Sequence, residues 1–426
     1  MARFVQPLIV CLCIAATSAE ARGQSSEGSA SEEQIHRIGQ WIDELDSDRF
    51  AVRNAASREL LEAGEPAIEL LSERLHQASP EAAWRSVQIL ALHCRYGSSR
   101  LSAAALDALE ANAASTDATA SRWALAALEE HRGFRHAQAV RALRAAGAHV
   151  TERNDEAQVR INNAWKGETD DLAHLQQVHG LTQISFANSL IGDAGLPHLA
   201  GVRKLERLYL GDSQVRGPGL ASLTDLASLN YLSLKGLQLV EEAAAHVGQL
   251  TQLEQLGLDD TTTTDAMLVQ LKDLKKLQTL WLNRTQITDE GLTHLKPLEN
   301  LNRLYLSGIS LDGTGLVHLA GLENLRYLSL QHAPITDAGA AAAARLTQLD
   351  ALGLDDTQIT DAGVEHLRPL TNLTQLWLTN TQATDAAVPH LKELTNLNRL
   401  DVKGCKFTEQ GLAELKRALP QCRIIH

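Results

Sequence analysis

A strict period of 24 residues constrains the second half of this chain more than any other feature. Ten leucines mark it without an insertion or a deletion: Leu181, Leu205, Leu229, Leu253, Leu277, Leu301, Leu325, Leu349, Leu373 and Leu397. Each opens the pattern L-x-x-L/I-x-L/F/V, and several units continue with T-x-I-T-D-x-G-L-x-x-L-x-x-L. Such a period indicates a supersecondary unit that buries its apolar side only by stacking on copies of itself. The stack presents a long inner face rather than a cleft, which favours recognition over catalysis.

The unit that begins at residue 277 shows how each repeat is expected to fold. Its apolar residues alternate inward and outward, which predicts a short strand paired with its neighbours in a parallel sheet. Thr288 and Asp289 stand at the expected start of a helix, where a side-chain oxygen caps free N–H groups. The buried stripe of this short outer helix is expected to be formed by Leu292, Leu295 and Leu298.

This pattern resembles the leucine-rich repeat. The resemblance implies an α/β solenoid over residues 151–426, a leucine-rich-repeat horseshoe with a parallel β-sheet on its concave face and short helices on its convex face. Ten regular repeats span residues 181–420. Terminal units of a solenoid are atypical because they cap its core, so degenerate caps are expected at both ends. Trp165, placed 24 residues before the inward position of Ser189, is expected to help close the first end.

Helical periodicity runs through residues 34–150. It predicts helices over Glu33–Leu45, Phe50–Glu62, Pro66–Gln77, Pro80–Cys94, Leu101–Ala111, Thr119–His131 and His136–Ala145. The stretch from Asp46 to Leu75 resembles a HEAT-like repeat pair, which implies that an all-α HEAT-like helical domain precedes the solenoid. An irregular helical bundle is the alternative.

The first residues have the pattern of an export signal. Arg3 precedes an apolar run from Val5 to Ala16, and the run ends in the small-residue site Ala19-Glu20-Ala21. We therefore expect a signal peptide at residues 1–21, a flexible linker at 22–33 and an exported, bacterial-type protein that is periplasmic, on the cell surface or secreted. The apolar run is too short to span a bilayer comfortably, so no membrane insertion is expected.

Three cysteines follow the predicted signal peptide: Cys94, Cys405 and Cys422. An odd and sparse count argues against a disulfide framework. Cys405 stands where other repeats carry an inward threonine, such as Thr285, which predicts a buried thiol. A disulfide between Cys405 and Cys422 in an oxidising compartment stays open.

A longer period of four repeats is superimposed on the 24-residue period. The outward residue between the two strand leucines runs Ser185, Tyr209, Ser233, Gly257, Trp281, Tyr305, Ser329, Gly353, Trp377, Asp401. The order Tyr, Ser, Gly, Trp therefore occurs twice, 96 residues apart. Duplication of a four-repeat block, with residues 205–300 giving 301–396, accounts for this pattern.

The concave face is the candidate ligand-binding surface, because Tyr, Trp and Arg dominate binding hot spots. The candidate residues are Arg207, Tyr209, Tyr231, Asp259, Asp260, Trp281, Arg303, Tyr305, Tyr327, Asp355, Asp356 and Trp377. As an alternative, Trp281 and Trp377 cover the bare backbone of Gly257 and Gly353 on the preceding strands. The paired aspartates have the chemistry of a cation site, but two carboxylates are few for Ca²⁺, so no metal site is expected.

Histidines occupy one column of the repeats, just before a helix leucine: His174, His198, His246, His294, His318, His366 and His390. Outer helices are expected to lie about 10 Å apart, which is too far for shared metal ligation. The column is therefore explained by copying of one histidine position with the repeat unit. His131 and His136, in an expected turn, are predicted to lie at the surface. The sequence contains no H-E-x-x-H, G-x-S-x-G or P-loop motif, and neither a cofactor nor enzymatic activity is expected.

These observations predict a non-catalytic recognition protein or scaffold that binds a protein or extended peptide through its concave face. A cell-envelope glycan is the alternative ligand, since aromatic rings beside carboxylates also suit sugars. A structural spacer without a specific ligand is a further alternative. The net charge of −13 argues against nucleic acid, which requires a basic footprint.

Overall fold

Helices fill the first part of the chain in the computed structural model, which describes residues 31–426. The predicted signal peptide and most of the predicted linker lie outside the described residues. Chain contacts separate two units, Met1–Gln138 and Ala139–His426. Within the described residues, no helix has the length and apolar character needed to cross a membrane.

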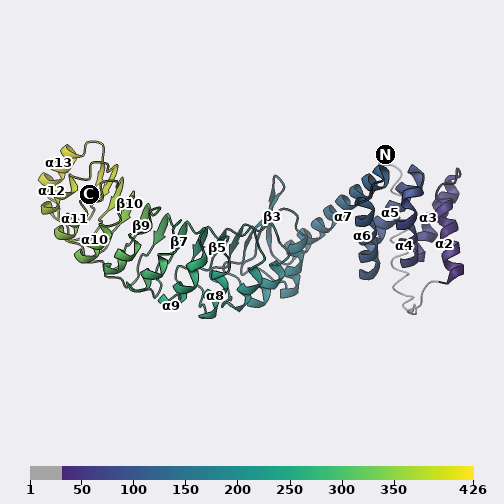
Figure 1. The fold of residues 1–426 in the computed structure, drawn as a ribbon, viewed down its shortest axis with the longest axis horizontal. Helices are drawn as coiled ribbons and strands as arrows, with labels where there is room; N and C mark the ends of the chain where they lie inside the picture. Colours follow the sequence, from purple (N-terminus) through teal and green to yellow (C-terminus); the bar gives the residue numbers. More distant parts are fainter. Residues whose placement is uncertain (1–30) are drawn as a thin grey trace. The chain divides into compact units, whose positions relative to one another are not determined.

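The helical unit consists of helices that stack in alternating order. Their bounds are α2 (Glu32–Glu44), α3 (Phe50–Ala63), α4 (Glu65–Arg74), the 3₁₀ turn η2 (Leu75–Gln77), α5 (Pro80–Tyr96), α6 (Ser99–Ala113) and α7 (Ala118–Ala145). Helix α2 packs on α4 and α4 on α6, while α3 packs on α5 (Figure 1). This stacking is the HEAT-like arrangement expected from the sequence, and its core is formed by residues such as Ile38, Leu60 and Leu90, which are fully buried.

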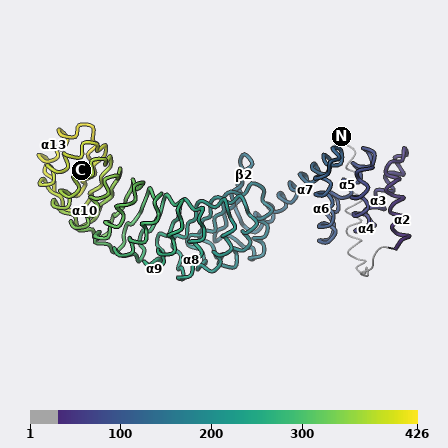
Figure 2. Tube along the Cα trace, viewed as in Figure 1, coloured from purple at the N-terminus to yellow at the C-terminus, as the bar shows by residue number. Residues whose placement is uncertain are grey.

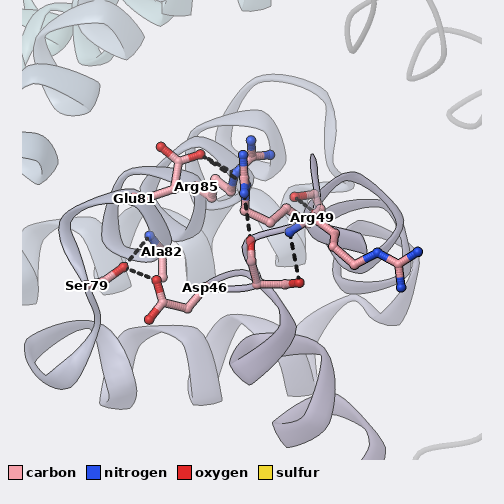
Figure 3. A network of polar contacts seen from close by, with 9 residues as sticks. Asp46, Arg49, Ser79, Glu81, Ala82 and Arg85 are labelled. Atoms are coloured by element: carbon pink, nitrogen blue, oxygen red, sulfur yellow. Dashed lines mark hydrogen bonds and ion pairs between the residues drawn. The ribbon is translucent and has the colours of Figure 1, made fainter. Parts of the chain in front are cut away.

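The serine cap of α5 connects two successive helix pairs. The Ser79 hydroxyl accepts a hydrogen bond from the Ala82 amide at the start of α5 (3.3 Å) and donates to Asp46, just before α3. Nearby, Glu81 accepts a hydrogen bond from the Arg85 guanidinium at 2.8 Å, as Figure 3 shows. The sequence signal for this cap, serine followed by proline, therefore also marks a contact between neighbouring pairs.

The predicted break between residues 131 and 136 is wrong, because α7 is continuous over Ala118–Ala145. Gly133 is exposed, and a Cβ placed there would meet no atom within 4 Å. One glycine costs a helix only about 1 kcal/mol relative to alanine, which does not end a long helix in the absence of proline. The continuous helix turns His131 inward, so this residue is buried (5% exposed) and not at the surface as predicted.

Two buried histidines give the helical unit a pH-dependent stability. Burial lowers the pKa of His93 and of His131 below 6.5, and Arg135 and Arg95 lower that of His131 further. Below about pH 6.5 the unfolded chain therefore binds more protons than the folded chain, and the free energy of unfolding falls. Hydrogen exchange in α5 and α7 is expected to speed up from about pH 7.5 to about pH 5.5, after correction for intrinsic rates.

Phenylalanine at His93 and His131 together is expected to flatten this pH dependence. Gln at His36, which is exposed on α2, serves as the control and is expected to leave it unchanged. Equal protection of α5 and α7 at both pH values in the parent protein would contradict the prediction.

The second unit is a stack of short strands joined in one sheet. The strands are β1 (His149–Arg153), β2 (Glu156–Arg160), β3 (Leu181–Ser185), β4 (Arg207–Tyr209), β5 (Tyr231–Ser233), β6 (Gln255–Gly257), β7 (Thr279–Trp281), β8 (Arg303–Tyr305), β9 (Tyr327–Ser329), β10 (Ala351–Gly353), β11 (Gln375–Trp377), β12 (Arg399–Asp401) and β13 (Arg423–Ile425). Within this unit the strands line the inner side of the curve and the helical segments line the outer side (Figure 1). The predicted α/β solenoid is confirmed.

The period fixes the register of the sheet. From β3 to β13 every strand pairs in parallel with the residue 24 positions on, so that Leu280, Leu304 and Leu328 form one fully buried column. Figure 2 shows the same turn of chain recurring through this unit. At the first end, β1 and β2 form an antiparallel hairpin that the sequence did not predict. Trp165 packs, partly buried, against this end of the core.

The outer segments are shorter and tighter than predicted. Many are 3₁₀ helices, because each repeat leaves only a few residues for its return path. Their bounds are η3 (Thr169–Gln177), η4 (Asp193–Leu199), η5 (Pro218–Leu223), α8 (Glu242–Gly248), α9 (Asp265–Leu268), η6 (Val269–Asp273), η7 (Gly291–Leu295), η8 (Thr314–Leu319), α10 (Asp337–Ala343), α11 (Asp361–His366), η9 (Asp385–Ala387), α12 (Val388–Leu391) and α13 (Glu409–Ala418).

The aspartate of the T-D-x-G pattern links one repeat to the next. Asp361 accepts hydrogen bonds from the amide and the hydroxyl of Thr384, both at 2.7 Å. Thr384 in turn caps its own helix through the Ala386 amide. The glycine of the pattern leaves room for this aspartate, since a Cβ on Gly411 would lie 2.1 Å from an oxygen of Asp385. The threonine therefore caps the helix of its own repeat, as predicted, whereas the aspartate accepts hydrogen bonds from the following repeat.

Cys94, Cys405 and Cys422 are free thiols in this structure. The Cys405 thiol donates a hydrogen bond to the Leu378 carbonyl at 2.9 Å and lies 3.2 Å from the Thr381 hydroxyl. Burial raises the pKa of this thiol, which keeps it protonated as a donor. Cys405 thus replaces the inward threonine of other repeats, as the sequence predicted, but it is only partly buried rather than buried.

Candidate interaction surface

The outward positions of the strands form two columns along the inner side of the repeat unit. One column contains Arg207, Tyr231, Arg303 and Tyr327, and the other contains Tyr209, Trp281, Tyr305 and Trp377. Because the register advances by 24 residues per strand, side chains from repeats far apart in sequence become neighbours across the sheet. The structure therefore brings together the aromatic residues and arginines singled out in the sequence.

Six aromatic rings form a continuous series, here called the aromatic ladder: Tyr209, Tyr231, Trp281, Tyr305, Tyr327 and Trp377. Their successive centroid distances are 4.8, 6.2, 5.6, 4.9 and 6.3 Å. At the junction of the two duplicated blocks, Trp281 and Tyr305 stack with an interplanar angle of 16°. All six residues are half-buried. Contacts of this kind each contribute about 0.5–1.5 kcal/mol beyond the area they bury, so the rings hold one another in place.

The ladder crosses the two glycine strands by leaning over them. Tyr231 and Trp281 are two strands apart, about 9.6 Å at the usual ~4.8 Å spacing, yet their ring centroids are 6.2 Å apart. Gly257, on the strand between them, is buried. Tyr327 and Trp377 repeat this arrangement across the strand of Gly353. The rings therefore form a continuous surface across both strands. The atoms nearest to a Cβ placed on Gly257 or Gly353 belong to Ser233 and Gln331 rather than to a ring, so covering of the glycines stays an alternative.

Three arginines flank the ladder at intervals of 96 residues. Arg207 and Arg303 are exposed, and in the described part of the chain neither has a carboxylate oxygen within 4.0 Å. Arg399 differs, because it lies 3.6 Å from the Asp401 carboxylate and its guanidinium sits 5.8 Å from the Trp377 ring centroid. Two positive charges thus remain available beside the rings.

The four candidate aspartates are engaged in contacts between repeats. Asp259 accepts a hydrogen bond from the Asn283 amide (2.9 Å), and Asp355 accepts one from the Thr379 amide (2.8 Å). Burial raises the pKa of Asp259. Asp260 pairs with Arg284, whose hydrogen bond lowers the pKa of that carboxyl. These carboxylates form a rim along the ends of the strands and link neighbouring repeats.

Asp356 lies 3.3 Å from the His332 imidazole and accepts a hydrogen bond from the Asn380 side chain at 2.8 Å. Among the described residues, no group of three or more His, Cys, Asp or Glu side chains is arranged to hold a metal ion.

One column missed in the sequence lies beside this rim. Its residues have positive φ in repeat after repeat: Asn188, Asp212, Gly236, Asp260, Arg284, Gly308, His332, Asp356, Asn380 and Gly404. The signal was the recurrence of Asn, Asp and Gly, which tolerate this conformation. Arg284 (φ 53°) and His332 (φ 59°) are the bulky exceptions, and each contacts an aspartate of the same column.

Comparison with known proteins gives one family match and several similar solved structures. The family model for the leucine rich repeat matches residues 321–342, and no curated protein matches the sequence. Among solved structures, the chain is similar to an internalin from Listeria monocytogenes, with 26% identity, a TM-score of 0.48 and coverage of 60% of this chain and 70% of that one.

Two further structures are more distant. A leucine-rich-repeat protein from Leptospira interrogans has 18% identity and a TM-score of 0.36, covering 59% of this chain and 86% of that one. The plant peptide hormone receptor RGFR1 in complex with RGF2 has 17% identity and a TM-score of 0.37, covering 59% of this chain and 48% of that one. With its 24-residue register and outer helices, the second unit has the leucine-rich-repeat fold, and a helical unit precedes it in the chain.

Proposed function

We propose that this protein is a non-catalytic recognition protein that binds a protein or an extended peptide on the concave face of its leucine-rich-repeat unit. The aromatic ladder is the observation that carries the proposal. It places six mutually packed rings beside two unpaired arginines, the residue types that dominate protein-binding hot spots. A continuous aromatic surface on a protein of net charge −13 is a feature that marks contact with a partner.

The ladder is also suited to binding because it is ordered before a partner arrives. Each inner ring contacts a ring on both sides, as Trp281 does with Tyr231 and Tyr305. Fixing such side chains in advance reduces the conformational entropy that association would otherwise cost, about 0.5–1.5 kcal/mol per side chain.

The same geometry gives less support to a glycan ligand. Sugars stack on an open aromatic face, whereas these rings turn toward one another at 4.8–6.3 Å. The rim carboxylates that a sugar would use are bonded to backbone amides of the next repeat. We also propose export, on the strength of the N-terminal sequence pattern alone.

Site-specific photo-cross-linking tests the binding face. A photo-reactive residue at Ser233, between the rings on the concave face, is expected to cross-link a polypeptide in cells that produce the protein. The same residue at Glu299, exposed on the outer side, is the matched control and is expected to give none. Cross-linking at Ser233 should disappear in a Trp281→Ala background.

Each alternative has its own outcome. A Ser233 adduct that resists protease but is removed by glycosidases would identify a glycan ligand. Cross-linking from Glu299 alone would move the interaction to the outer face. Adducts from neither position would leave the protein a spacer.

A further inference from the structure

We infer that the concave face selects an acidic extended peptide in which two carboxylates, about six residues apart, bind Arg207 and Arg303. This inference rests on the proposed function and adds the chemistry of the ligand to it. It follows from the distribution of charge along the two central columns and from the distance between the arginines.

The central columns contain no carboxylate from β3 to β11. Their residues, two per strand, are Gln183, Ser185, Arg207, Tyr209, Tyr231, Ser233, Gln255, Gly257, Thr279, Trp281, Arg303, Tyr305, Tyr327, Ser329, Ala351, Gly353, Gln375 and Trp377. Both charges in this set are positive, although the chain has 52 acidic and 39 basic residues. The central face is thus a positively charged strip on an acidic protein, and it complements a negatively charged ligand.

The two arginines occupy equivalent surroundings. Arg207 pairs in register with Tyr231, and Arg303 pairs in register with Tyr327. Each is exposed, and within the described chain each lacks an acidic partner. The third arginine of the series, Arg399, is already paired with Asp401. A guanidinium without a partner offers a carboxylate two parallel hydrogen bonds, a geometry that lysine does not provide.

The nearest carboxylates of the rim lie beside the columns and are already engaged. Asp259 and Asp355 each accept a backbone amide hydrogen bond from the following repeat, and Asp260 is paired with Arg284. These carboxylates bond to the following repeat beside the columns. Burial raises the pKa of Tyr231 and of Tyr327, and Asp259 and Asp355 still act electrostatically on these tyrosines and raise the pKa of each further.

The spacing of the arginines sets the spacing of the acidic groups. Arg207 and Arg303 lie on β4 and β8, four strands apart, which is about 19 Å at ~4.8 Å per strand. An extended peptide advances about 3.3 Å per residue, so two carboxylates about six residues apart span this distance. Such a peptide would cross the strands and run along the ladder, with the residues between its carboxylates against Tyr231 and Trp281.

The test is selection of binders from a phage-displayed library of random twelve-residue peptides against the full-length chain. Enrichment of Asp or Glu at two positions about six residues apart is the expected result. For a selected peptide, Arg207→Gln and Arg303→Gln are each expected to weaken binding about tenfold at low salt concentration. The loss should be smaller at high salt concentration, because screening already weakens the ion pairs of the parent protein. Arg345→Gln, at an exposed arginine that follows α10 outside the columns, is the matched control and should leave affinity unchanged.

The outcomes separate this inference from the proposed function. Selection of neutral or basic peptides that still require Trp281 would overturn the acidic preference and keep concave-face binding. Both the inference and the proposed function would be overturned by peptides that bind the Trp281→Ala and Trp377→Ala variants as tightly as the parent protein. A selection that enriches no peptide would have the same consequence. Binding of a single-stranded oligonucleotide that is lost in Arg207→Gln, without any peptide binding, would reassign the strip to nucleic acid.

Discussion

Replacing Leu304 with aspartate is expected to destroy the folded state of the central repeats. Leu304 is fully buried in β8, between Leu280 of β7 and Leu328 of β9. Its replacement removes a packed side chain and places a carboxylate where only apolar neighbours surround it. Leucine-to-alanine changes alone cost about 2–5 kcal/mol, and an unpaired buried charge adds to that cost. We expect a loss of about 5 kcal/mol or more in the free energy of unfolding.

The control is the replacement of Glu299 with alanine. Glu299 precedes the same repeat but is exposed on its outer turn, and surface changes of this kind usually stay within about 0.5 kcal/mol. Urea unfolding followed by circular dichroism, with hydrogen exchange to locate the change, measures both variants. Comparable losses in the two would show that the inner and outer faces have been interchanged.

The damage is expected to spread only to neighbouring repeats at first. Each repeat contacts the one before and the one after it, so the stability of the unit is approximately a sum of repeat and interface contributions. Loss of hydrogen-exchange protection should therefore be largest around β7–β9 and smaller toward β13.

The sequence was sufficient to predict the strands and their register, because a fixed period leaves one pairing that buries every leucine column. The same reasoning correctly placed the inward Cys405 and the two outward columns. It did not predict the β1–β2 hairpin, since a cap occurs once and shows no period. It also divided α7 at Gly133, because local breaker signals do not reveal the tertiary packing that holds a long helix together.

The sequence was sufficient to predict which residues belong to the candidate site, but not how their side chains are arranged. The period showed that six rings and the arginines share a face. The leaning of Tyr231 and Trp281 across the Gly257 strand depends on side-chain rotamers, which the pattern does not contain. The carboxylates of Asp259 and Asp355 looked equally available in the sequence, yet the following repeat engages both.

Trp281→Ala and Trp377→Ala are expected to weaken partner binding by about 2 kcal/mol or more each, roughly a thirtyfold rise in Kd, if both rings are hot spots. They occupy equivalent positions in the duplicated blocks, so their effects on affinity should be similar. Binding can be measured with the partner cross-linked at Ser233 or with a peptide selected as above. Glu299→Ala again serves as the control that touches neither ring.

Melting temperature distinguishes a role of the tryptophans in partner binding from a role in covering the glycine strands. The two tryptophans contact different neighbours, so their removal should affect stability differently. Trp281 contacts a ring on each side, whereas Trp377 contacts Tyr327 and the Arg399 guanidinium at the end of the ladder. Removing Trp281 divides the ladder and should lower stability more than removing Trp377, since each ring pair contributes about 0.5–1.5 kcal/mol. Similar affinity losses with unequal melting temperatures would establish both roles. If both variants melt early but the folded fraction binds as tightly as the parent protein, the ladder is scaffold and the concave face binds its partner elsewhere.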